Sequence, residues 1–301
     1  MLAKTLPFAV ARWGRWWLAI RPGTLSAAVS PVLVGSAAAA AEGHFRAGVF
    51  FAALVASTMI QIGCNLANDV FDFERGADSA DRVGPPRMTQ MGLLSPAQVR
   101  TAMVMAFTTA AAIGIYLVAV AGWPILAIGV LSILFAVLYT GGPVPLGYIG
   151  LGDASVFVFF GLLAVTGSYY LHAEELTSLA FAATIPVAFI VTAILVVNNL
   201  RDIETDRRAG KRTMAVLLGQ RLSRLEYVAL VLGAYASLPV LMLAGSGPWV
   251  WLAWLSLPMG LRCVRTVVGG AAGRQLNPIL KGTAQLHLVF GGLLALGLLL
   301  D

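Results

Sequence analysis

The chain has 301 residues, of which 59% are hydrophobic and 11% carry a charge. Water-soluble domains carry about a quarter charged residues, so this composition excludes an ordinary soluble domain and makes the lipid bilayer the expected solvent. The net charge of +6 does not predict nucleic-acid binding, because the Lys and Arg residues sort to one side of the apolar segments. Cys64 and Cys263 lie in different apolar segments, so neither a disulfide nor a Cys-type metal site is predicted.

Apolar stretches recur along the chain at about the 20 residues that a helix needs to cross the hydrocarbon core. Nine transmembrane helices are predicted, at residues 17–41, 45–71, 98–121, 123–140, 151–171, 176–199, 223–244, 248–267 and 278–300. They leave no room for a separate soluble domain, so residues 1–301 are expected to form one all-α, polytopic transmembrane domain around a central cavity. The first span contains Arg21 and Pro22 and no small-residue cleavage site, so a removable signal peptide is not expected.

The basic residues predict which side of the membrane each loop faces. Once the nine spans are drawn, 19 of the 20 Lys and Arg residues fall on one side and only Arg46 falls on the other. By the positive-inside rule, the N-terminus and the loops at 72–97, 200–222 and 268–277 are cytoplasmic. The C-terminus is then outside, and the cavity is expected to open to the cytoplasm. The expected location is the cytoplasmic (inner) membrane of a bacterium.

Acidic residues concentrate in two of these cytoplasmic segments, which a basic loop does not by itself require. The end of the second span carries four polar residues spaced i, i+3, i+4 and i+7, which we name the first stripe: Asn65, Asn68, Asp69 and Asp72. The end of the sixth span repeats the arrangement in the second stripe: Asn198, Asn199, Asp202 and Asp206. Such spacing places each set along one side of a helix.

Polar stripes at the ends of apolar helices are expensive unless they face an ion, a partner or water. A single Asp would be explained by helix capping or by pairing with a nearby Arg, but two stripes at matching depth favour a shared site. Oxygen ligands suit Mg²⁺, which takes one or two carboxylates and completes its shell with water and phosphate. We therefore predict that each stripe holds one Mg²⁺ and that the two ions clamp a diphosphate. The predicted metal ligands are Asn65, Asn68, Asp69, Asp72, Asp202 and Asp206, and the four Asp residues among them are the predicted catalytic residues.

Basic residues accompany both stripes. Arg82 and Arg87 follow the first stripe. Guanidinium and ammonium groups stabilise phosphate oxygens, although any cytoplasmic loop of a membrane protein is rich in Lys and Arg. The predicted diphosphate-binding residues lie in and after the second stripe: Asn198, Asn199, Arg201, Lys211 and Arg212.

Further motifs accompany the stripes over the first six spans. They read Arg21-Pro22-x-Thr24-Leu25, Gln61-Ile-Gly-x-Asn65-x-x-Asn68-Asp69-x-Phe71-Asp72-Phe73, Tyr139-Thr140-Gly141-Gly142-Pro143, Pro145-Leu146-Gly147-Tyr148-x-Gly150-Leu151-Gly152-Asp153 and Asn198-Asn199-Leu200-Arg201-Asp202-x-Glu204-x-Asp206. Together these motifs resemble the UbiA superfamily of intramembrane aromatic prenyltransferases. Within it they look most like the branch that uses 1,4-dihydroxy-2-naphthoate.

The resemblance implies a substrate pair. A polyprenyl group would pass from polyprenyl diphosphate to 1,4-dihydroxy-2-naphthoate, with release of diphosphate and CO₂, to give a demethylmenaquinone for menaquinone biosynthesis. The isoprenoid tail would lie in an apolar channel that meets membrane lipid. The expected acceptor-binding residues are Arg21 or Arg87 for the carboxylate, Tyr139 and Asp153 for a ring hydroxyl or for positioning the ring, and also Gln61.

Departures from the family pattern leave alternatives open. Where the superfamily often has a third Asp in its first motif this chain has Gly76, and the next acid is Asp78. Pro143 stands where hydroxybenzoate-type enzymes carry a Lys, which argues against 4-hydroxybenzoate as acceptor. Homogentisate and 4-hydroxybenzoate nevertheless remain alternative acceptors. A cation-coupled transporter is the alternative from another class, but it predicts acids near the bilayer midplane, whereas these acids gather at one face.

Overall fold

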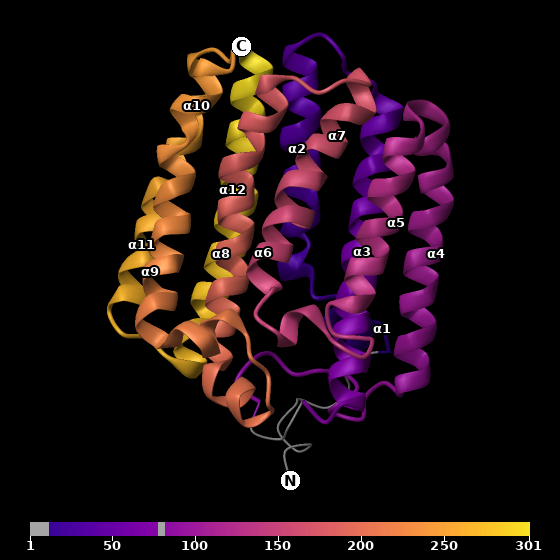
Figure 1. Ribbon diagram of the computed structural model, residues 1–301, viewed down its shortest axis with the longest axis vertical. Helices are drawn as coiled ribbons and strands as arrows, with labels where there is room; N and C mark the ends of the chain where they lie inside the picture. The colour runs from indigo at the N-terminus through magenta and orange to yellow at the C-terminus, as the bar shows by residue number, and fades with distance from the viewer. Residues whose placement is uncertain (1–11, 78–81) are drawn as a thin grey trace.

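The computed structural model describes residues 12–77 and 82–301, which form helices and loops without strands. Figure 1 shows the helices side by side with their axes nearly aligned, so the all-α prediction is confirmed. The α-helices are α1 (Arg12–Ile20), α2 (Ser26–Ala41), α3 (Ala47–Glu74), α4 (Pro96–Ala121), α5 (Trp123–Leu138), α6 (Gly152–Val156), α7 (Ala164–Ala173), α8 (Ser178–Arg208), α9 (Met214–Ala236), α10 (Leu238–Leu243), α11 (Leu257–Val268) and α12 (Asn277–Leu300). The shorter elements are the 3-10 helices η2 (Pro22–Thr24), η3 (Leu146–Tyr148), η5 (Pro248–Ser256) and η6 (Gly273–Leu276), and the π-helix η4 (Phe157–Leu163) between α6 and α7.

Six helices in the described part of the chain are long and apolar enough to cross a bilayer. They run over Ala47–Glu74, Pro96–Ala121, Gly152–Ala173, Ser178–Arg208, Met214–Leu243 and Gly273–Leu300. A seventh span results if the bent pair Gly14–Thr24 and Ser26–Ala41, which meet at 49°, is counted as one. The protein is therefore a multi-pass membrane protein.

Two of the nine predicted spans do not reach this length in the described residues, although all nine ranges coincide with helical segments. Helix α5 has only 16 residues, because Gly122 turns the chain before it with φ 78° and a Gly-Gly-Pro segment follows it. The range 248–267 divides into η5 and the 12-residue α11, so no single α-helix fills it. By helix length and composition alone, the described residues therefore contain six spans, or seven with the bent pair counted as one.

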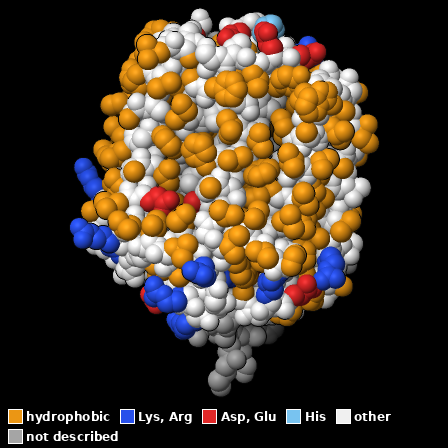
Figure 2. All heavy atoms as spheres, in the orientation of Figure 1, with side chains coloured by type: hydrophobic (Ala, Val, Ile, Leu, Met, Phe, Trp, Pro, Cys, Tyr) orange, Lys and Arg blue, Asp and Glu red, His pale blue; other side chains and the backbone are white. Residues whose placement is uncertain are grey.

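The surface of the bundle matches a bilayer environment. Figure 2 shows hydrophobic side chains over most of the flank that faces the viewer, while Lys and Arg side chains gather toward the lower end of the view. Helices α3 and α8 both finish at this lower end in Figure 1. An apolar belt between polar ends is the expected form of a helical bundle whose outer side chains contact lipid tails.

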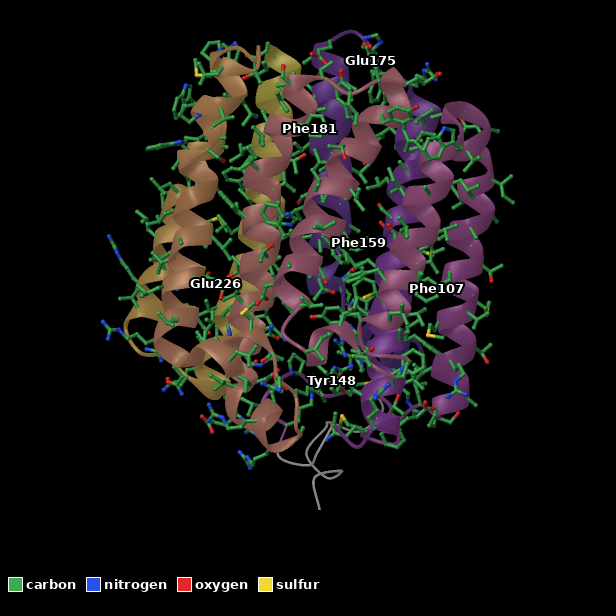
Figure 3. All side chains as sticks on the ribbon, in the orientation of Figure 1. Phe107, Tyr148, Phe159, Glu175, Phe181 and Glu226 are labelled. Atoms are coloured by element: carbon green, nitrogen blue, oxygen red, sulfur yellow. The ribbon has the colours of Figure 1, made fainter. Side chains whose placement is uncertain are left out.

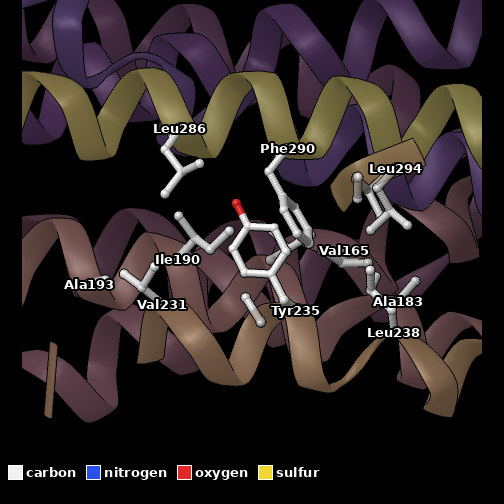
Figure 4. Close-up of a cluster of buried hydrophobic side chains, with 14 of the residues drawn as sticks. Val165, Ala183, Ile190, Ala193, Val231, Tyr235, Leu238, Leu286, Phe290 and Leu294 are labelled. Carbon is white, nitrogen blue, oxygen red and sulfur yellow. The ribbon is translucent and has the colours of Figure 1, made fainter. Parts of the chain in front are cut away.

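The largest buried cluster holds α2, α7, α8, α9, η5 and α12 together. Figure 4 shows the Tyr235 ring between Leu286 and Phe290 of α12 and Ile190 of α8. The Tyr235 and Phe290 rings meet edge to face at 5.2 Å, and the Tyr235 hydroxyl shares a hydrogen bond of 2.8 Å with Ser256. In lipid, such packing and interhelical hydrogen bonds are what associate helices.

Small residues bring the helices into close approach. In α12, a Cβ added to Gly291 would lie 2.8 Å from the Ser30 Cβ of α2, whereas a Cβ on the adjacent Gly292 would meet no atom within 4 Å. Glycine at position 291 therefore lets α12 pack directly on α2. The same contact is closed by the Ser30 hydroxyl, which donates to the His287 carbonyl at 3.0 Å.

These neighbouring glycines provide a matched test of the packing. Gly291→Ala should lower the thermal unfolding midpoint in detergent, by the equivalent of about 1 to 3 kcal/mol, because the added methyl group overpacks the interface with α2. Gly292→Ala should be neutral or stabilise by up to about 1 kcal/mol through helix propensity. Equal midpoints for the two variants would contradict this account of the contact.

Candidate active site

The two polar stripes lie at the same end of the bundle, on the last turns of α3 and α8. Both contribute to one cavity of about 140 Å³, which we name the polar cavity. The predicted site residues that line it are Arg21, Asn68, Asp72, Arg87, Tyr139, Asn198, Asn199, Asp202, Asp206 and Lys211. Segments more than 120 residues apart in the chain thus meet at one site.

Asp72 lies at the centre of the ionic contacts in the polar cavity. Its carboxylate is 2% exposed and accepts hydrogen bonds from Arg87 at 2.6 Å, the Tyr148 hydroxyl at 2.6 Å and Lys211 at 3.2 Å. These donors come from the loop after α3, from η3 and from the loop after α8. One buried carboxylate therefore joins three separate segments, and each stabilises its charge.

Asp69 has different surroundings from Asp72. Its carboxylate accepts from the backbone N–H groups of Met88 and Thr89, at 3.2 and 3.4 Å. The side chain is 1% exposed and is not among the residues that line the polar cavity. Asp69 therefore fixes the loop that carries Arg87 against α3.

The remaining polar residues of α3 hold neighbouring segments. The Asn65 amide donates to the Ile20 carbonyl and to the Thr24 hydroxyl, each at 2.9 Å, and Gln61 makes longer contacts to Thr24. These bonds fix η2 beside α3, next to Arg21, whose backbone is in the left-handed region at φ 52°. The side-chain Oδ1 of Asn68 accepts from the Thr140 hydroxyl at 2.9 Å, which ties the segment after α5 to the same stripe.

In the second stripe, Arg201 is a partner of the acids and does not line the polar cavity. Its guanidinium donates twice to the Asp202 carboxylate, at 2.8 and 2.5 Å. It also donates to Asn198 at 2.9 Å and to Asn277 at 3.2 Å, so it connects α8 to the start of α12. Arg212 donates its backbone N–H to the Tyr148 carbonyl at 2.9 Å, which holds the loop after α8 against η3.

Tyr148 is a site residue to which the sequence prediction assigned no role. Besides donating to Asp72, its ring lies 4.5 Å from the Lys211 ammonium and 5.8 Å from the Arg75 guanidinium. Burial, and then the neighbouring Asp72 charge, raise the pKa of Tyr148 above its ordinary value, so the phenol stays protonated and remains a donor. One feature of the sequence could have indicated Tyr148: it lies in a Pro- and Gly-rich segment that resembles the family motif. Such a segment forms a turn, and the turn positions the Tyr148 ring.

The donor chemistry of the polar cavity fits a partly hydrated Mg²⁺. In the described residues, no three His, Cys, Asp or Glu side chains lie close enough to form an all-protein metal cage. The cavity instead presents carboxylate and amide oxygens from two helices, including Asn68, Asp72, Asp202 and Asp206. Mg²⁺ commonly takes one or two carboxylates and leaves its other positions to water and phosphate, so these oxygens suit such an ion. Asp78 lies outside the described residues.

The polar cavity continues into apolar space. A second cavity of about 160 Å³ shares Asn68, Tyr139 and Asn198 with it and also includes Gln61 and Asn65. A third, of about 620 Å³, is lined by side chains of α2, α3, α4, α5 and α7 and shares Phe135 and Phe160 with the second. Figure 3 shows Tyr148 of the polar cavity near the lower end of the bundle and Phe159 of the large apolar cavity nearer its middle.

The π-helix η4 shapes the connection between these cavities. Its neighbouring residues Phe159 and Phe160 both line the large apolar cavity, and Phe159 stacks on Phe135 of α5 with ring centroids 4.2 Å apart. π-helical turns are frequent at functional sites. Here the turn directs successive aromatic rings to the boundary between polar and apolar space.

Asp153 stands apart from the polar cavity. It begins α6, is 5% exposed, and its Oδ1 has no hydrogen-bond partner within the described part of the chain. A Cβ added to the preceding Gly152 would lie 3.1 Å from the Tyr139 hydroxyl, so Tyr139 packs directly against this turn. Both residues were predicted to bind the acceptor; Tyr139 lines the polar cavity and the second cavity, whereas Asp153 lines neither.

The fold and the site define a class of protein: a helical membrane protein with a charged cavity, suited to phosphate groups, and a larger apolar cavity deeper in the bundle. The chain belongs to the UbiA prenyltransferase family, whose pattern it matches over residues 28–276. This confirms the family predicted from the sequence motifs.

Characterised relatives cover nearly the whole chain. It is 37% identical to the 1,4-dihydroxy-2-naphthoate octaprenyltransferase of Escherichia coli, over 97% of each chain. It is 39% identical to the enzyme of the same name from Mycobacterium tuberculosis, over 96% of this chain and 99% of that one. The Bacillus subtilis enzyme of that name is 31% identical over 95% and 92% of the two chains.

Solved structures share the fold at low sequence identity. A UbiA homolog from Aeropyrum pernix K1 superposes with a TM-score of 0.70 at 13% identity, over 88% of this chain and 95% of that one. A UbiA homolog from Archaeoglobus fulgidus bound to GPP and Mg²⁺ gives a TM-score of 0.64 at 13% identity, over 95% of this chain and all of that one. The arrangement of helices is therefore that of the family.

The buried Arg87–Asp72 pair should contribute much more to stability than an exposed pair in the same region. Arg87→Ala leaves the buried Asp72 carboxylate without its guanidinium and should destabilise the protein by about 3 kcal/mol, seen as a lower thermal midpoint in detergent. Arg100→Ala removes the exposed ion pair with Glu74 and should change stability by less than about 1 kcal/mol. Comparable losses in the two variants would refute the central position given to Asp72.

Proposed function

We propose that this protein transfers a polyprenyl group from polyprenyl diphosphate to 1,4-dihydroxy-2-naphthoate. The reaction releases diphosphate and CO₂ and gives a demethylmenaquinone, an intermediate of menaquinone biosynthesis. The observation that carries the proposal is that two polar stripes and their basic partners line one cavity, and that a second cavity shares wall residues both with it and with an apolar cavity of about 620 Å³. The names of the E. coli and M. tuberculosis relatives support the choice of donor and acceptor.

The proposed arrangement in the membrane has nine crossings, formed by residues 1–301 as a single domain in a bacterial inner membrane. Helix η5 followed by α11 extends over about 36 Å at the usual rises of 3-10 and α-helices, which exceeds the ~30 Å hydrocarbon core. Helix α5, at about 24 Å, crosses where the large cavity lies. Lys and Arg gather at the lower end of the bundle (Figure 2), which supports a cytoplasmic site, the N-terminus inside and the C-terminus outside.

The proposed metal ligands are two pairs of residues on the cavity wall. Asn68 and Asp72 would hold one Mg²⁺, and Asp202 and Asp206 a second. The structure of the Archaeoglobus homolog with GPP and Mg²⁺ supports the use of this ion. Asp69 and Asn65 were also predicted as ligands, but their contacts to the 88–89 backbone and to η2 favour positioning roles.

Several side chains of the protein would have separate roles in binding the diphosphate and stabilising its charge. Mg²⁺, when bound, supplies positive charge to the diphosphate oxygens as the C1–O bond breaks. Lys211 and Arg87 already lie against Asp72, so both can donate to phosphate beside the metal. Arg201 orients Asp202 through its two hydrogen bonds, and Tyr148 orients Asp72 while its ring supports the Lys211 ammonium.

The apolar cavities would protect the cation and hold the tail. An allylic cation reacts with any nearby water, and the walls formed by Phe135, Phe159 and Phe160 exclude water from its path. Arg21 lines the polar cavity from the η2 turn and is the proposed partner of the acceptor carboxylate, since Arg87, the alternative, lies against Asp72. Gln61 and Tyr139 line the second cavity, where the acceptor ring would face the C1 atom of the donor.

An assay of purified protein with Mg²⁺, polyprenyl diphosphate and 1,4-dihydroxy-2-naphthoate tests the proposed reaction. Wild type should form the prenylated product, and chelation of divalent ions should stop it. Asp72→Asn and Asp202→Asn should each lower kcat about 100-fold or more, since both weaken charge stabilisation of the leaving group. Glu204→Gln is the matched control, because Glu204 is exposed and pairs with Arg207. Product formation only with homogentisate or 4-hydroxybenzoate would overturn the acceptor assignment, and unchanged rates in both Asp variants would overturn the site.

The large apolar cavity predicts a dependence on tail length. Ala56→Trp places a large side chain in the cavity lining and should lower kcat/KM for a long polyprenyl diphosphate about tenfold, while geranyl diphosphate reacts nearly as in wild type. Val55→Trp is the control on the same helix, because Val55 is 44% exposed on the outer surface. An equal effect of Ala56→Trp on long and short donors would contradict the assignment of this cavity to the tail.

A further inference from the structure

Helix α11 presents two cations on the outer surface of the bundle. It packs on α9, α12 and η5, and its buried residues recur at helical spacing: Gly260, Cys263, Val264 and Val267. Arg262 and Arg265 are one turn apart on the other side of the helix, and both are exposed. This face therefore carries charge that neither the polar cavity nor the packing of the helices uses.

The Arg262 and Arg265 guanidinium groups have no partner within the protein as far as the structure describes it. Over residues 12–77 and 82–301, neither group makes a hydrogen bond or an ion pair. Three exposed arginines elsewhere are each paired with a glutamate: Arg46, Arg100 and Arg207. Arg262 and Arg265 are therefore available to an anion that does not belong to this chain.

The surroundings of these two arginines are apolar. Leu255 before them is 69% exposed and Val268 after them is 61% exposed. At a rise of 1.5 Å per residue, Arg262 and Arg265 lie about 9 and 4.5 Å from the end of α11. Figure 1 places α11 at the left edge of the bundle, and Figure 2 shows Lys and Arg side chains that project sideways from this edge. A cation at this depth is costly in hydrocarbon, but a long side chain can extend to the lipid headgroups.

The helices on either side of α11 add positive charge near the same end. Arg221 lies near the start of α9 and Lys281 lies in the second turn of α12, and both are exposed. Farther from this end, the exposed residues of α9 and η5 are apolar and include Leu232 and Leu255. The flank thus combines a basic lower part with an apolar upper part. An anionic phospholipid has the complementary arrangement, with a charged headgroup and apolar acyl chains.

We propose that Arg262 and Arg265 bind the phosphate of an anionic phospholipid such as phosphatidylglycerol, whose acyl chains lie along the apolar surface of α11 and η5. Side chains three apart on a helix have Cβ atoms about 5–6 Å from one another, so both guanidinium groups can donate to the free oxygens of one phosphodiester. A zwitterionic lipid brings a cation of its own, which the two arginines repel. The site therefore favours an anionic headgroup.

A lipid bound to α11 would stabilise more than this helix. The chain continues from α11 through η6 to Asn277, the first residue of α12. The Asn277 side chain accepts from Arg201 and donates to the Val83 carbonyl, each at 3.2 Å. A lipid that holds α11 in place therefore also restrains the start of α12. Because a ligand of the folded state raises stability by mass action, lipid binding can be measured through the thermal unfolding midpoint.

The test measures the thermal unfolding midpoint of the purified protein in detergent during titration with phosphatidylglycerol, phosphatidylcholine or inorganic phosphate. Phosphatidylglycerol should raise the wild-type midpoint more than phosphatidylcholine does. Inorganic phosphate should not raise it, because it has no acyl chains to cover the apolar surface. The double variant Arg262→Gln with Arg265→Gln should bind phosphatidylglycerol about tenfold more weakly or worse. Arg262→Lys with Arg265→Lys keeps both charges and should retain most of the preference for the anionic lipid.

The matched control is Arg100→Gln with Arg207→Gln, which removes the same charge from exposed positions that pair with Glu74 and Glu204. It should respond to phosphatidylglycerol as wild type does.

Several results would overturn the lipid site. One is an equal response to phosphatidylglycerol in wild type and in the Gln variant of Arg262 and Arg265. Others are equal responses of wild type to the two lipids, or equal protection by inorganic phosphate. A wild-type dimer that the Gln variant converts to a monomer, with its lipid response intact, would assign this face to a second copy of the chain. Each readout is independent of prenyl transfer, so the inference and the proposed function can fail separately.

Discussion

The structure around the site depends on the burial of one carboxylate, Asp72, in the lower end of a lipid-embedded bundle. A buried charge is tolerated only when it is paired and hydrogen-bonded, so Asp72 requires Arg87, Lys211 and Tyr148 around it. Each of those partners is delivered by a different loop. The loops after α3, before α6 and after α8 are consequently held in place by the Asp72 carboxylate. The polar cavity is the space between these loops.

The second constraint is that lipid, and not water, surrounds the sides of the bundle. Because the bundle is surrounded by lipid, apolar cavities inside it stay dry, and polar and apolar space meet in the second cavity, whose wall contains Asn68 as well as Phe135 and Phe160. A substrate that carries phosphate at one end and hydrocarbon at the other fits this boundary. The same boundary explains why positioning residues are numerous: Asp69, Asn65 and Arg201 each hold a neighbouring segment by hydrogen bonds that water would weaken.

The sequence predicted the helical membrane fold, the family and the meeting of the two stripes, because hydropathy and i, i+3, i+4 spacing are local properties. It did not separate cavity residues from those behind them. Asp69 and Asp72 are three residues apart on one helix face, yet one binds a backbone loop and the other lines the cavity. The role of Tyr148 depends on its hydrogen bond to the distant Asp72, which spacing along the chain does not encode. The length of α5 was likewise set by its flanking glycines.

The central claim is that both stripes hold one diphosphate through divalent metal. The direct measurement is calorimetric binding of a non-hydrolysable polyprenyl thiodiphosphate to the purified protein, with and without Mg²⁺. The account predicts tight binding only with Mg²⁺. Loss of either Asp72 or Asp202 should weaken the affinity about tenfold or more. Loss of both should weaken the affinity no more than marginally further than loss of one. Equally tight binding without Mg²⁺, or strictly additive losses in the double variant, would contradict it.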